Sequence, residues 1–294
     1  MIEQKSNIGM PPNSVEPSAI GPCLLAWAGA FLGLSALGLL IFLLTDGKDF
    51  SSPAIILIGF TPSLAALAIA SLWFGVRGIR SLLRPIGKWK VGWQWYALVL
   101  LGPLVLMFLA HIISSPLGIA QPQPWVVIPA LGSTLGPLIA GSLGEEIGWR
   151  GFAQPLLQKR YSMFWASIII GILWSTWHLW PILAPNGPVH ITPPDVVQTY
   201  VRLISTAVIY GWIYNKTGGS LLLVMLAHAG HNIADDILPP AAEGTALIMA
   251  FLYLVAAIAV VLTIRAQIFS RPKENGPRTE ASKVQQRSVT EPTP

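Results

Sequence analysis

The chain has 294 residues, of which 53% are hydrophobic and 11% are charged, and its mean hydropathy is +0.61. This composition excludes an ordinary soluble domain and is typical of an integral membrane protein. The formal net charge of +5 does not indicate a nucleic-acid partner, because the basic residues are spread over loops and form no groove interleaved with aromatic residues. Cys23 is the single cysteine, so neither a disulfide framework nor a thiolate metal cluster is expected.

Apolar runs recur along the chain, and each approaches the roughly 20 residues that a helix needs to cross a bilayer core. They predict an all-α membrane bundle of eight transmembrane helices at 22–44, 53–74, 94–114, 137–158, 162–181, 196–214, 219–237 and 246–265. The apolar stretch 125–136 is interrupted by proline and glycine, which indicates a short extra or re-entrant helix. Polar composition predicts disordered tails at 1–20 and 270–294.

The basic residues set the orientation, because positively charged loops stay on the cytoplasmic side of a membrane. With the N-terminus inside, fifteen of the 18 Lys and Arg residues fall on cytoplasmic segments, and the outer loops hold only Lys48. Arg150 and Arg202 lie within predicted helices. Both termini are therefore expected in the cytoplasm, and we expect the chain to be integral to a bacterial plasma membrane with membrane lipid around it.

Three places break the apolar pattern of the predicted spans with ionisable or amide side chains. They are the segments 144–151, 174–178 and 228–232. A charge near the bilayer centre costs on the order of 2.5 to 3.5 kcal/mol, so an ionisable residue inside a membrane indicates a functional site.

The first segment places two carboxylates and a guanidinium on one helix. Glu146 and Arg150 share a helix face at a spacing of four residues, where they can neutralise each other, whereas Glu145 points about 100° away. The spacing predicts that Glu146 and Arg150 form a buried supporting pair and that Glu145 is free to face a cavity. The alternative is an interfacial cluster of charges at the cytoplasmic end of the helix.

The other two segments supply imidazoles and an amide. His228 and Asn232 share a helix face, with His231 beside them, and Trp174 lies one turn before His178. A single histidine in an apolar helix is usually a packing residue, and the tryptophan with its histidine can equally belong to an interfacial aromatic belt. Two histidines and an asparagine within five positions favour a site.

Depth along the helices brings four of these residues to a similar level. At 1.5 Å per residue, Glu145, His178, His228 and Asn232 lie roughly 18 to 27 Å from the basic residue at the inner edge of their helices. A carboxylate in a low-dielectric site can take a proton from water and share it with an imidazole, which suits Glu145 and His178. His228 and Asn232 suit an oxyanion site. No serine or cysteine nucleophile is indicated, so direct attack by water is the simpler chemistry.

These residues resemble, in order and approximate spacing, the three motifs of the CAAX prenyl endopeptidase and bacteriocin-processing family of membrane proteases, also called CPBP or Abi. The motifs are Glu145-Glu146-x-x-x-Arg150, an aromatic residue four positions before His178, and His228-x-x-x-Asn232. The resemblance implies a catalytic core at 125–237, preceded by membrane helices at 21–124 and followed by a last one at 238–269. One departure is Trp174, where the family pattern usually carries phenylalanine.

The resemblance also implies an activity and a site. The chain would be an endopeptidase acting on a peptide or protein substrate, prenylated in the eukaryotic branch of the family. The catalytic residues would be Glu145 and His178 for water activation with His228 and Asn232 as the oxyanion site, and the supporting residues would be Glu146, Arg150 and Trp174. This assignment agrees with the one from spacing and depth.

Alternatives remain open for the cofactor and for the activity. Zn²⁺ held by Glu145, His178 and His228 with a bound water is an alternative to metal-free water activation, although the chain has no His-Glu-x-x-His helix. A non-catalytic peptide-binding or immunity protein of the same family is one rival function, and a transporter is another. Arg202 could pair with a substrate carboxylate or with Glu146, or could extend to the interface. His111 and His190 are left outside the predicted site.

Overall fold

The computed structural model describes residues 15–45, 52–120, 125–129, 139, 141–184, 191–239 and 243–268. The helices are α1 Pro17–Leu44, α2 Pro53–Leu83, α3 Trp93–Ser114, α5 Gln154–Leu157, α6 Met163–His178, α7 Pro193–Lys216, α8 Leu221–Ile237 and α9 Glu243–Ile268. Short 3₁₀ turns follow two of them, at η2 Arg84–Gly87 and η4 Trp180–Leu183, and η3 Ile147–Ala153 is a π-helix. The described part of the chain contains no strand, so the predicted all-α class is confirmed.

Within the described residues, six helices are long and apolar enough to cross a membrane. They contain α1, α2, α3, α6, α7 and α9, and they coincide with six of the eight predicted spans. The predicted span at 219–237 appears as α8, which has 17 residues. The span at 137–158 is divided between helical residues 141–146, η3 and α5, with residues 137, 138 and 140 outside the described part. The count of eight stays a prediction.

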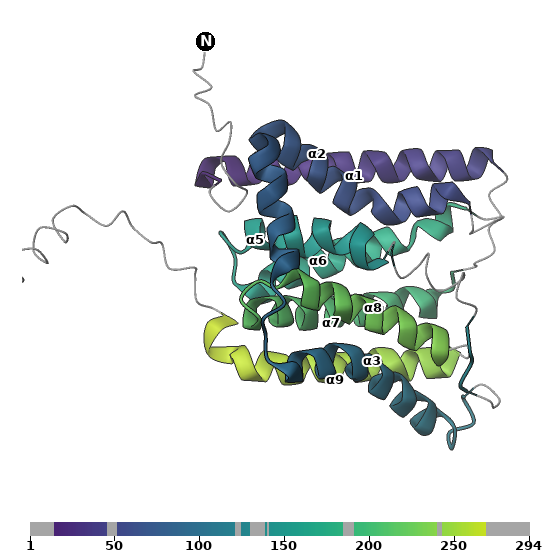
Figure 1. Cartoon of the computed structure of the whole chain (residues 1–294). Helices are drawn as coiled ribbons and strands as arrows, with labels where there is room; N and C mark the ends of the chain where they lie inside the picture. The colour runs from purple at the N-terminus through teal and green to yellow at the C-terminus, as the bar shows by residue number, and fades with distance from the viewer. Residues whose placement is uncertain are drawn as a thin grey trace, which may run out of the picture.

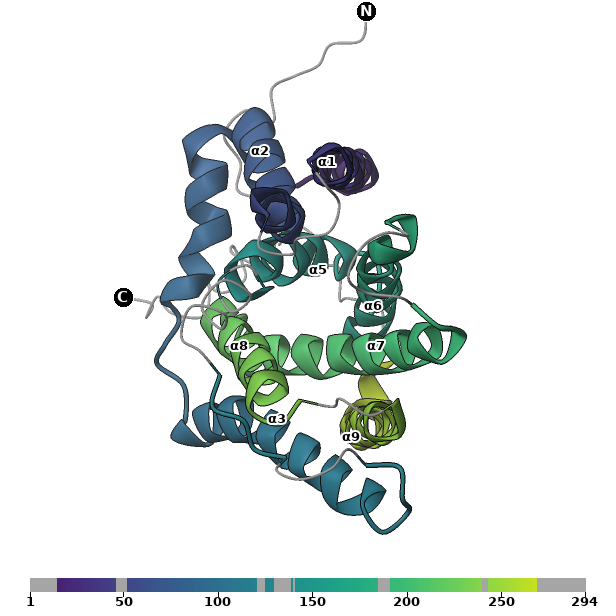
Figure 2. The same ribbon diagram turned by 90° about the vertical axis from the view of Figure 1, so that its right-hand side faces the viewer.

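The helices are stacked in pairs around the segment 141–157. α1 packs on α2, α6 on α7, and α3 on α8 and α9, while η3 lies against α2. In Figure 1 the α1 and α2 pair lies at one edge of the molecule, and α9 and α3 lie at the other. Figure 2 shows α5, α6, α7 and α8 grouped between these two layers. The centre of the bundle is thus formed by the helices that carry the three polar motifs.

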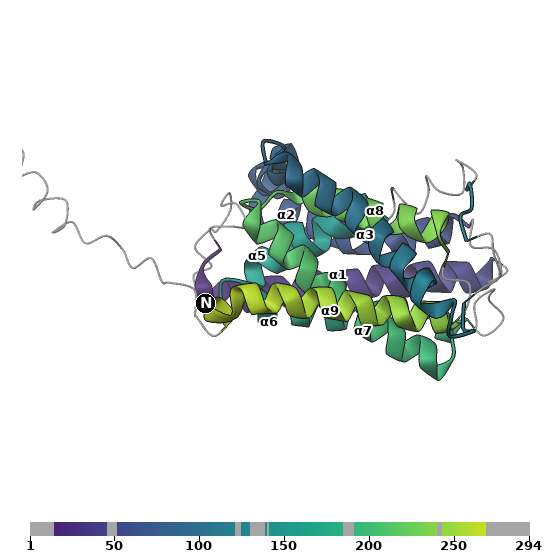
Figure 3. The ribbon, with the colours of Figure 1, turned by 90° about the horizontal axis from the view of Figure 1, so that it is seen from below.

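The outer helices expose apolar side chains over their length. On α9, which runs the length of the bundle (Figure 3), Phe251, Ile258 and Leu262 are 58, 49 and 62% exposed. In a water-soluble protein such a surface would be a large apolar patch, whereas in a bilayer it contacts lipid tails. The protein is therefore an integral membrane protein whose polar groups are kept inside.

α2 bends sharply after the predicted span 53–74. Gly75 has φ 61° and ψ −156°, a conformation open to glycine and strained for other residues. The helix then continues to Leu83 in a different direction, visible in Figure 1 as the segment that crosses the others beside the α2 label. This second part carries Arg77 and Arg80, so the bend turns a basic segment away from the membrane-spanning part of α2.

The ends of the helices differ by a few residues from the sequence-based expectation. α1 starts at Pro17, inside the predicted tail 1–20, because proline is well suited to the first turn of a helix. Residues 125–129 of the predicted short helix have no helical structure, and 130–136 lie outside the described residues. Residues 1–14 and the predicted tail 270–294 also lie outside them.

Candidate active site

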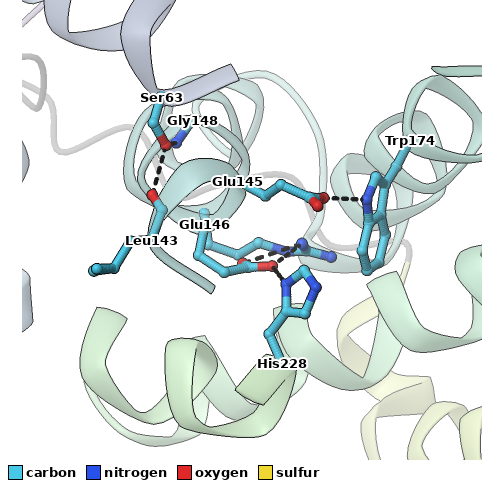
Figure 4. A network of polar contacts seen from close by, with 8 residues as sticks. Ser63, Leu143, Glu145, Glu146, Gly148, Trp174 and His228 are labelled. Atoms are coloured by element: carbon cyan, nitrogen blue, oxygen red, sulfur yellow. Dashed lines mark hydrogen bonds and ion pairs between the residues drawn. The ribbon is translucent and has the colours of Figure 1, made fainter. Parts of the chain in front are cut away.

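The segment that carries Glu145 and Glu146 changes its helical form next to them. Residues 141–146 are α-helical, and a π-helical turn follows from Ile147 to Ala153. π-turns are rare and frequent at functional sites. Ser63 of α2 stabilises the transition, because its hydroxyl donates to the Leu143 carbonyl at 3.0 Å and accepts from the Gly148 N–H at 3.2 Å (Figure 4).

Gly148 allows this segment to lie directly on α2. A Cβ atom at this position would overlap the backbone of Pro62, so only glycine fits without movement. The close approach places η3 against α2 and fixes the direction in which the preceding carboxylates point.

Glu146 and Arg150 form a fully buried ion pair with a third partner from another helix. Arg150 Nη1 donates to Glu146 Oε1 at 2.9 Å and to Oε2 at 3.1 Å, and both side chains are 0% exposed. His228 Nδ1 of α8 lies 2.8 Å from Glu146 Oε1. Since an ion-paired carboxylate only accepts hydrogen bonds, Nδ1 of His228 carries the proton. Glu146 thus ties α8 to the carboxylate segment, a contact that spacing along one helix did not predict.

Glu145 is also buried and has a partner. Its side chain points away from Glu146, and Trp174 Nε1 of α6 donates to Glu145 Oε2 at 2.5 Å (Figure 4). Glu145 is 5% exposed. One of its oxygens thus has a protein partner, because the chain carries tryptophan where phenylalanine would offer no N–H group. The expectation that Glu145 faces a cavity stays a prediction.

The indole of Trp174 contacts both imidazoles of the predicted catalytic set. Its ring centroid lies 5.6 Å from that of His178 and 5.5 Å from that of His228, in edge-on arrangements. His178 Nδ1 lies 3.0 Å from the Trp174 carbonyl oxygen. A carbonyl only accepts, so Nδ1 donates and Nε2 of the neutral ring is left with its lone pair. Among the contacts described, Glu145 and His178 meet through Trp174.

His228 Nε2 and the Asn232 amide converge in front of Gly141. A Cβ atom placed on Gly141 would lie 2.5 Å from Asn232 Nδ2 and 3.1 Å from His228 Nε2. Two nitrogen atoms from one face of α8 therefore point at the same small volume beside the carboxylate segment. The predicted residues Glu145, His178, His228 and Asn232 come from three separate helical segments, and the structure brings them together around Trp174 and Gly141.

A second polar cluster lies farther along α8. Arg202 Nη1 of α7 donates to Asp235 Oδ2 at 3.2 Å, and His231 Nε2 lies 3.6 Å from the same oxygen. His231 Nδ1 lies 2.6 Å from the Tyr253 hydroxyl of α9. Arg202 therefore pairs with Asp235 and not with Glu146, which settles its partner within the protein.

The positions of the candidate zinc ligands do not fit a zinc site. Within the described residues, no group of three or more His, Cys, Asp or Glu side chains is close enough to hold a metal ion. The one alternative set, Glu145, His178 and His228, is separated by the indole of Trp174, and His228 uses Nδ1 for Glu146.

A large apolar cavity lies beside the cluster. Its volume is about 730 Å³, and residues of α3, α7, α8 and α9 line it. Tyr210 and Ala227 belong to its wall, and they are next to the site, since the Tyr210 ring lies 6.1 Å from that of His228. A hydrocarbon chain in this cavity would therefore lie close to the polar cluster.

The fold and the site define a class of protein, an integral membrane protein of packed helices with two buried carboxylates beside two imidazoles at its centre. Residues 127–234 match the family of type II CAAX prenyl endopeptidases, described as Rce1-like. The matched segment carries the three motifs, and the resemblance stated from the motifs is confirmed.

A curated relative supports the same placement. The chain is 30% identical over 139 residues to the protein named CAAX prenyl protease 2 of Methanococcus maripaludis. These residues make up 46% of this chain and 51% of the relative. The chain thus spans about half the length of the curated relative that it matches. The matched segment 127–234 holds all four predicted catalytic residues.

Sequence reasoning missed two residues that shape the site. Ser63 supports the carboxylate segment from another helix, and a polar residue in an apolar span was the signal that could have indicated it. Gly141 gives no comparable signal, because its role depends on the distance to α8.

Proposed function

We propose that the chain is an intramembrane endopeptidase of the CAAX prenyl protease type, which hydrolyses a peptide bond with water activated by Glu145 and His178. The observation that carries the proposal is the grouping of buried Glu145 and His228 with partly buried His178 around Trp174, in a segment that matches a peptidase family. Glu146 already has Arg150 as a counter-ion, so the two adjacent carboxylates have different tasks.

In the proposed reaction, a water molecule attacks the peptide carbonyl carbon and gives a proton to Glu145. The Trp174 N–H holds one oxygen of Glu145, which leaves the other for water. Nε2 of His178 carries a lone pair and can accept or return a proton. The proton taken from water is finally delivered to the leaving amine as the carbon–nitrogen bond breaks.

The negative oxygen that forms during the attack would be stabilised by His228 and Asn232. Asn232 Nδ2 is a hydrogen-bond donor, and His228 Nε2 donates in the imidazolium form, in which Nδ1 also carries a proton and donates it in a hydrogen bond to Glu146. Removal of one such donor in other hydrolases lowers turnover by about 10² to 10³-fold. The mechanism uses no metal ion.

We further propose that the substrate is a peptide or protein with a lipidated cysteine near its C-terminus. The apolar cavity beside Tyr210 and Ala227 supports this proposal, because it can hold a hydrocarbon chain next to the polar cluster. The chain would lie in a bacterial plasma membrane with both termini in the cytoplasm, in keeping with the positions of its Lys and Arg residues.

The test is cleavage of synthetic peptides by the purified full chain. Peptides ending in a CAAX sequence, with and without a prenyl group on the cysteine, would be incubated with wild type, Glu145→Gln and His178→Gln. Glu16→Gln is the matched control, since Glu16 is exposed at the start of α1. Cleavage by wild type and Glu16→Gln, lost in the two site variants, is the expected result.

The other outcomes separate the alternatives. Cleavage that survives both site substitutions would overturn the assignment of Glu145 and His178. Loss of cleavage with a chelator, restored by Zn²⁺, would replace the metal-free mechanism. Binding of peptide without any cleavage by wild type would favour the non-catalytic rival, and cleavage of the unlipidated peptide at the same rate would contradict the role of the apolar cavity.

A further inference from the structure

Four polar residues form a row along α7, and the proposed mechanism assigns no chemical step to them. Gln198, Arg202, Thr206 and Tyr210 follow one another at intervals of four residues. Residues at this spacing lie on one face of a helix, about 6 Å apart along its axis. The row therefore extends over roughly 18 Å, which is more than half of the roughly 30 Å thickness of a bilayer core.

α8 presents a matching row in the opposite direction. Arg202 pairs with Asp235 at one end, and the rings of Tyr210 and His228 are 6.1 Å apart at the other. His231 lies between these two positions on α8. The two helices are antiparallel neighbours, and they face each other with polar side chains from the Arg202–Asp235 pair to the site.

Several polar atoms of this seam are buried without a partner in the described part of the protein. They are Gln198 Oε1, Arg202 Nε, Thr206 Oγ1, Tyr210 Oη and Asp235 Oδ1. Thr206 is 0% exposed and Tyr210 is 3% exposed. Burial of a polar group without a hydrogen bond costs on the order of 1 to 3 kcal/mol, so one such atom is unfavourable, and five of them along one seam indicate a bound polar ligand.

One end of the row lies at a polar cavity, and the other end lies at the buried cluster of the site. At one end Gln198, Arg202 and Asp235 line a polar cavity of about 390 Å³, together with Asp195 and Glu243. At the other end Tyr210 lies under the guanidinium of Arg150, with 5.1 Å from the Arg150 carbon to the ring centre. The seam thus joins a polar cavity at the end of the bundle to the buried cluster.

We propose that a file of water molecules runs along this seam from the polar cavity to the active site and supplies the water that is consumed in hydrolysis. One water molecule can bridge two polar atoms that lie up to about 6 Å apart, since two hydrogen bonds of about 2.8 Å span nearly that distance, and the rise between successive residues of the row is about the same. A site surrounded by lipid-facing helices needs such a supply, because every turnover removes one water molecule.

The row of side chains also explains why each of them is polar within an apolar helix. Thr206 holds the middle of the path, where no charged residue is present on α7. Its hydroxyl both donates and accepts, so it can link two water molecules. The inference that this water is the reactant rests on the proposed function. The inference that water is present along α7 is independent of the proposed function.

The first experiment tests for water without any reference to activity. Cys23, the single cysteine, is replaced by alanine, and Thr206→Cys or Ser205→Cys is then introduced. Both positions are buried, at 0 and 3% exposure, and they are about 100° apart around α7. The purified protein is treated with silver ions in chloride-free buffer, and the thiols that remain are counted by mass after denaturation and alkylation.

The expected result is that the thiol at position 206 reacts with silver at least ten times faster than the thiol at position 205. Equal rates at the two positions would overturn the proposal, because they would indicate general permeability. Lack of reaction at position 206 would overturn it as well, because it would show that water does not reach the seam.

The second experiment asks whether this water is used. Thr206→Val keeps the shape of the side chain and removes the hydroxyl, and Thr206→Ser restores it. Turnover of a cleaved peptide is expected to fall about tenfold in Thr206→Val with unchanged peptide affinity, and to return in Thr206→Ser, while Ser205→Ala behaves as wild type. Unchanged turnover in Thr206→Val would refute the use of this path, whereas a wild type that cleaves nothing would refute the proposed function and leave the thiol result standing.

Discussion

Gly141→Ala is the substitution for which the structure predicts the sharpest separation between stability and activity. The new Cβ would lie 2.5 Å from Asn232 Nδ2, whereas an ordinary contact begins near 3.4 Å, so the amide has to retreat by about 0.9 Å. His228 Nε2, at 3.1 Å, has to move by only about 0.3 Å. The substitution therefore disturbs the two proposed oxyanion donors unequally.

The expected loss follows from that displacement. A misplacement of about 1 Å in a catalytic group can lower the rate by about 10²-fold, so turnover should fall by about this factor. Residue 141 is helical, and alanine stabilises a helix interior by about 1 kcal/mol relative to glycine. The thermal midpoint of unfolding should therefore stay the same or rise while turnover falls.

The assay is peptide cleavage by purified protein, with Gly33→Ala as the matched control. A Cβ on Gly33 of α1 would meet nothing within 4 Å, so this variant should cleave like wild type. In an Asn232→Ala background the clash with the amide is absent, and the further effect of Gly141→Ala should be less than about tenfold. A loss of the same size in both backgrounds would refute the reasoning.

Three further variants test the supports of the site. Trp174→Phe removes the N–H that holds Glu145, and loss of a hydrogen bond to a charged group, about 1.5 to 3 kcal/mol, should lower turnover at least tenfold in a protein that still folds, as measured by cleavage and thermal unfolding. Arg150→Met removes the guanidinium from the fully buried Glu146 and leaves His228 as the partner of its carboxylate, so we expect a destabilisation of about 3 to 5 kcal/mol. An unchanged unfolding midpoint would contradict the ion pair. Gly148→Ala should lower the unfolding midpoint in the same assay, because its Cβ would overlap the backbone of α2.

The sequence predicted the helical class and the residues of the site because both depend on patterns within single helices. Apolar runs mark the spans, and the spacing of four residues between Glu146 and Arg150 needs no knowledge of neighbours. The three motifs stand out because charged and amide groups are costly in a membrane. Their roles in catalysis stay predictions.

The features that the sequence did not predict are contacts between helices. The hydrogen bond from Trp174 to Glu145 and the contact of His228 with Glu146 join segments 29 and 82 residues apart, and nothing in the local pattern specifies such a pairing. The π-turn after Glu146 was missed for the same reason, since Ser63 of another helix stabilises it. The sequence alone could not choose between partners for Arg202, which depended on the antiparallel register of two helices.

The sharing of Glu146 between Arg150 and His228 has a consequence for the synthesis of the protein. The carboxylate segment enters the membrane long before α8, which is the second-last helix described and supplies the imidazole and the amide. Until α8 has been inserted, Glu146 has only the partner within its own segment, and the volume in front of Gly141 has no donors around it. A nascent chain would therefore lack the complete site while most of its helices are already in the bilayer, and the proposed hydrolysis could begin only when the last motif has left the ribosome and docked.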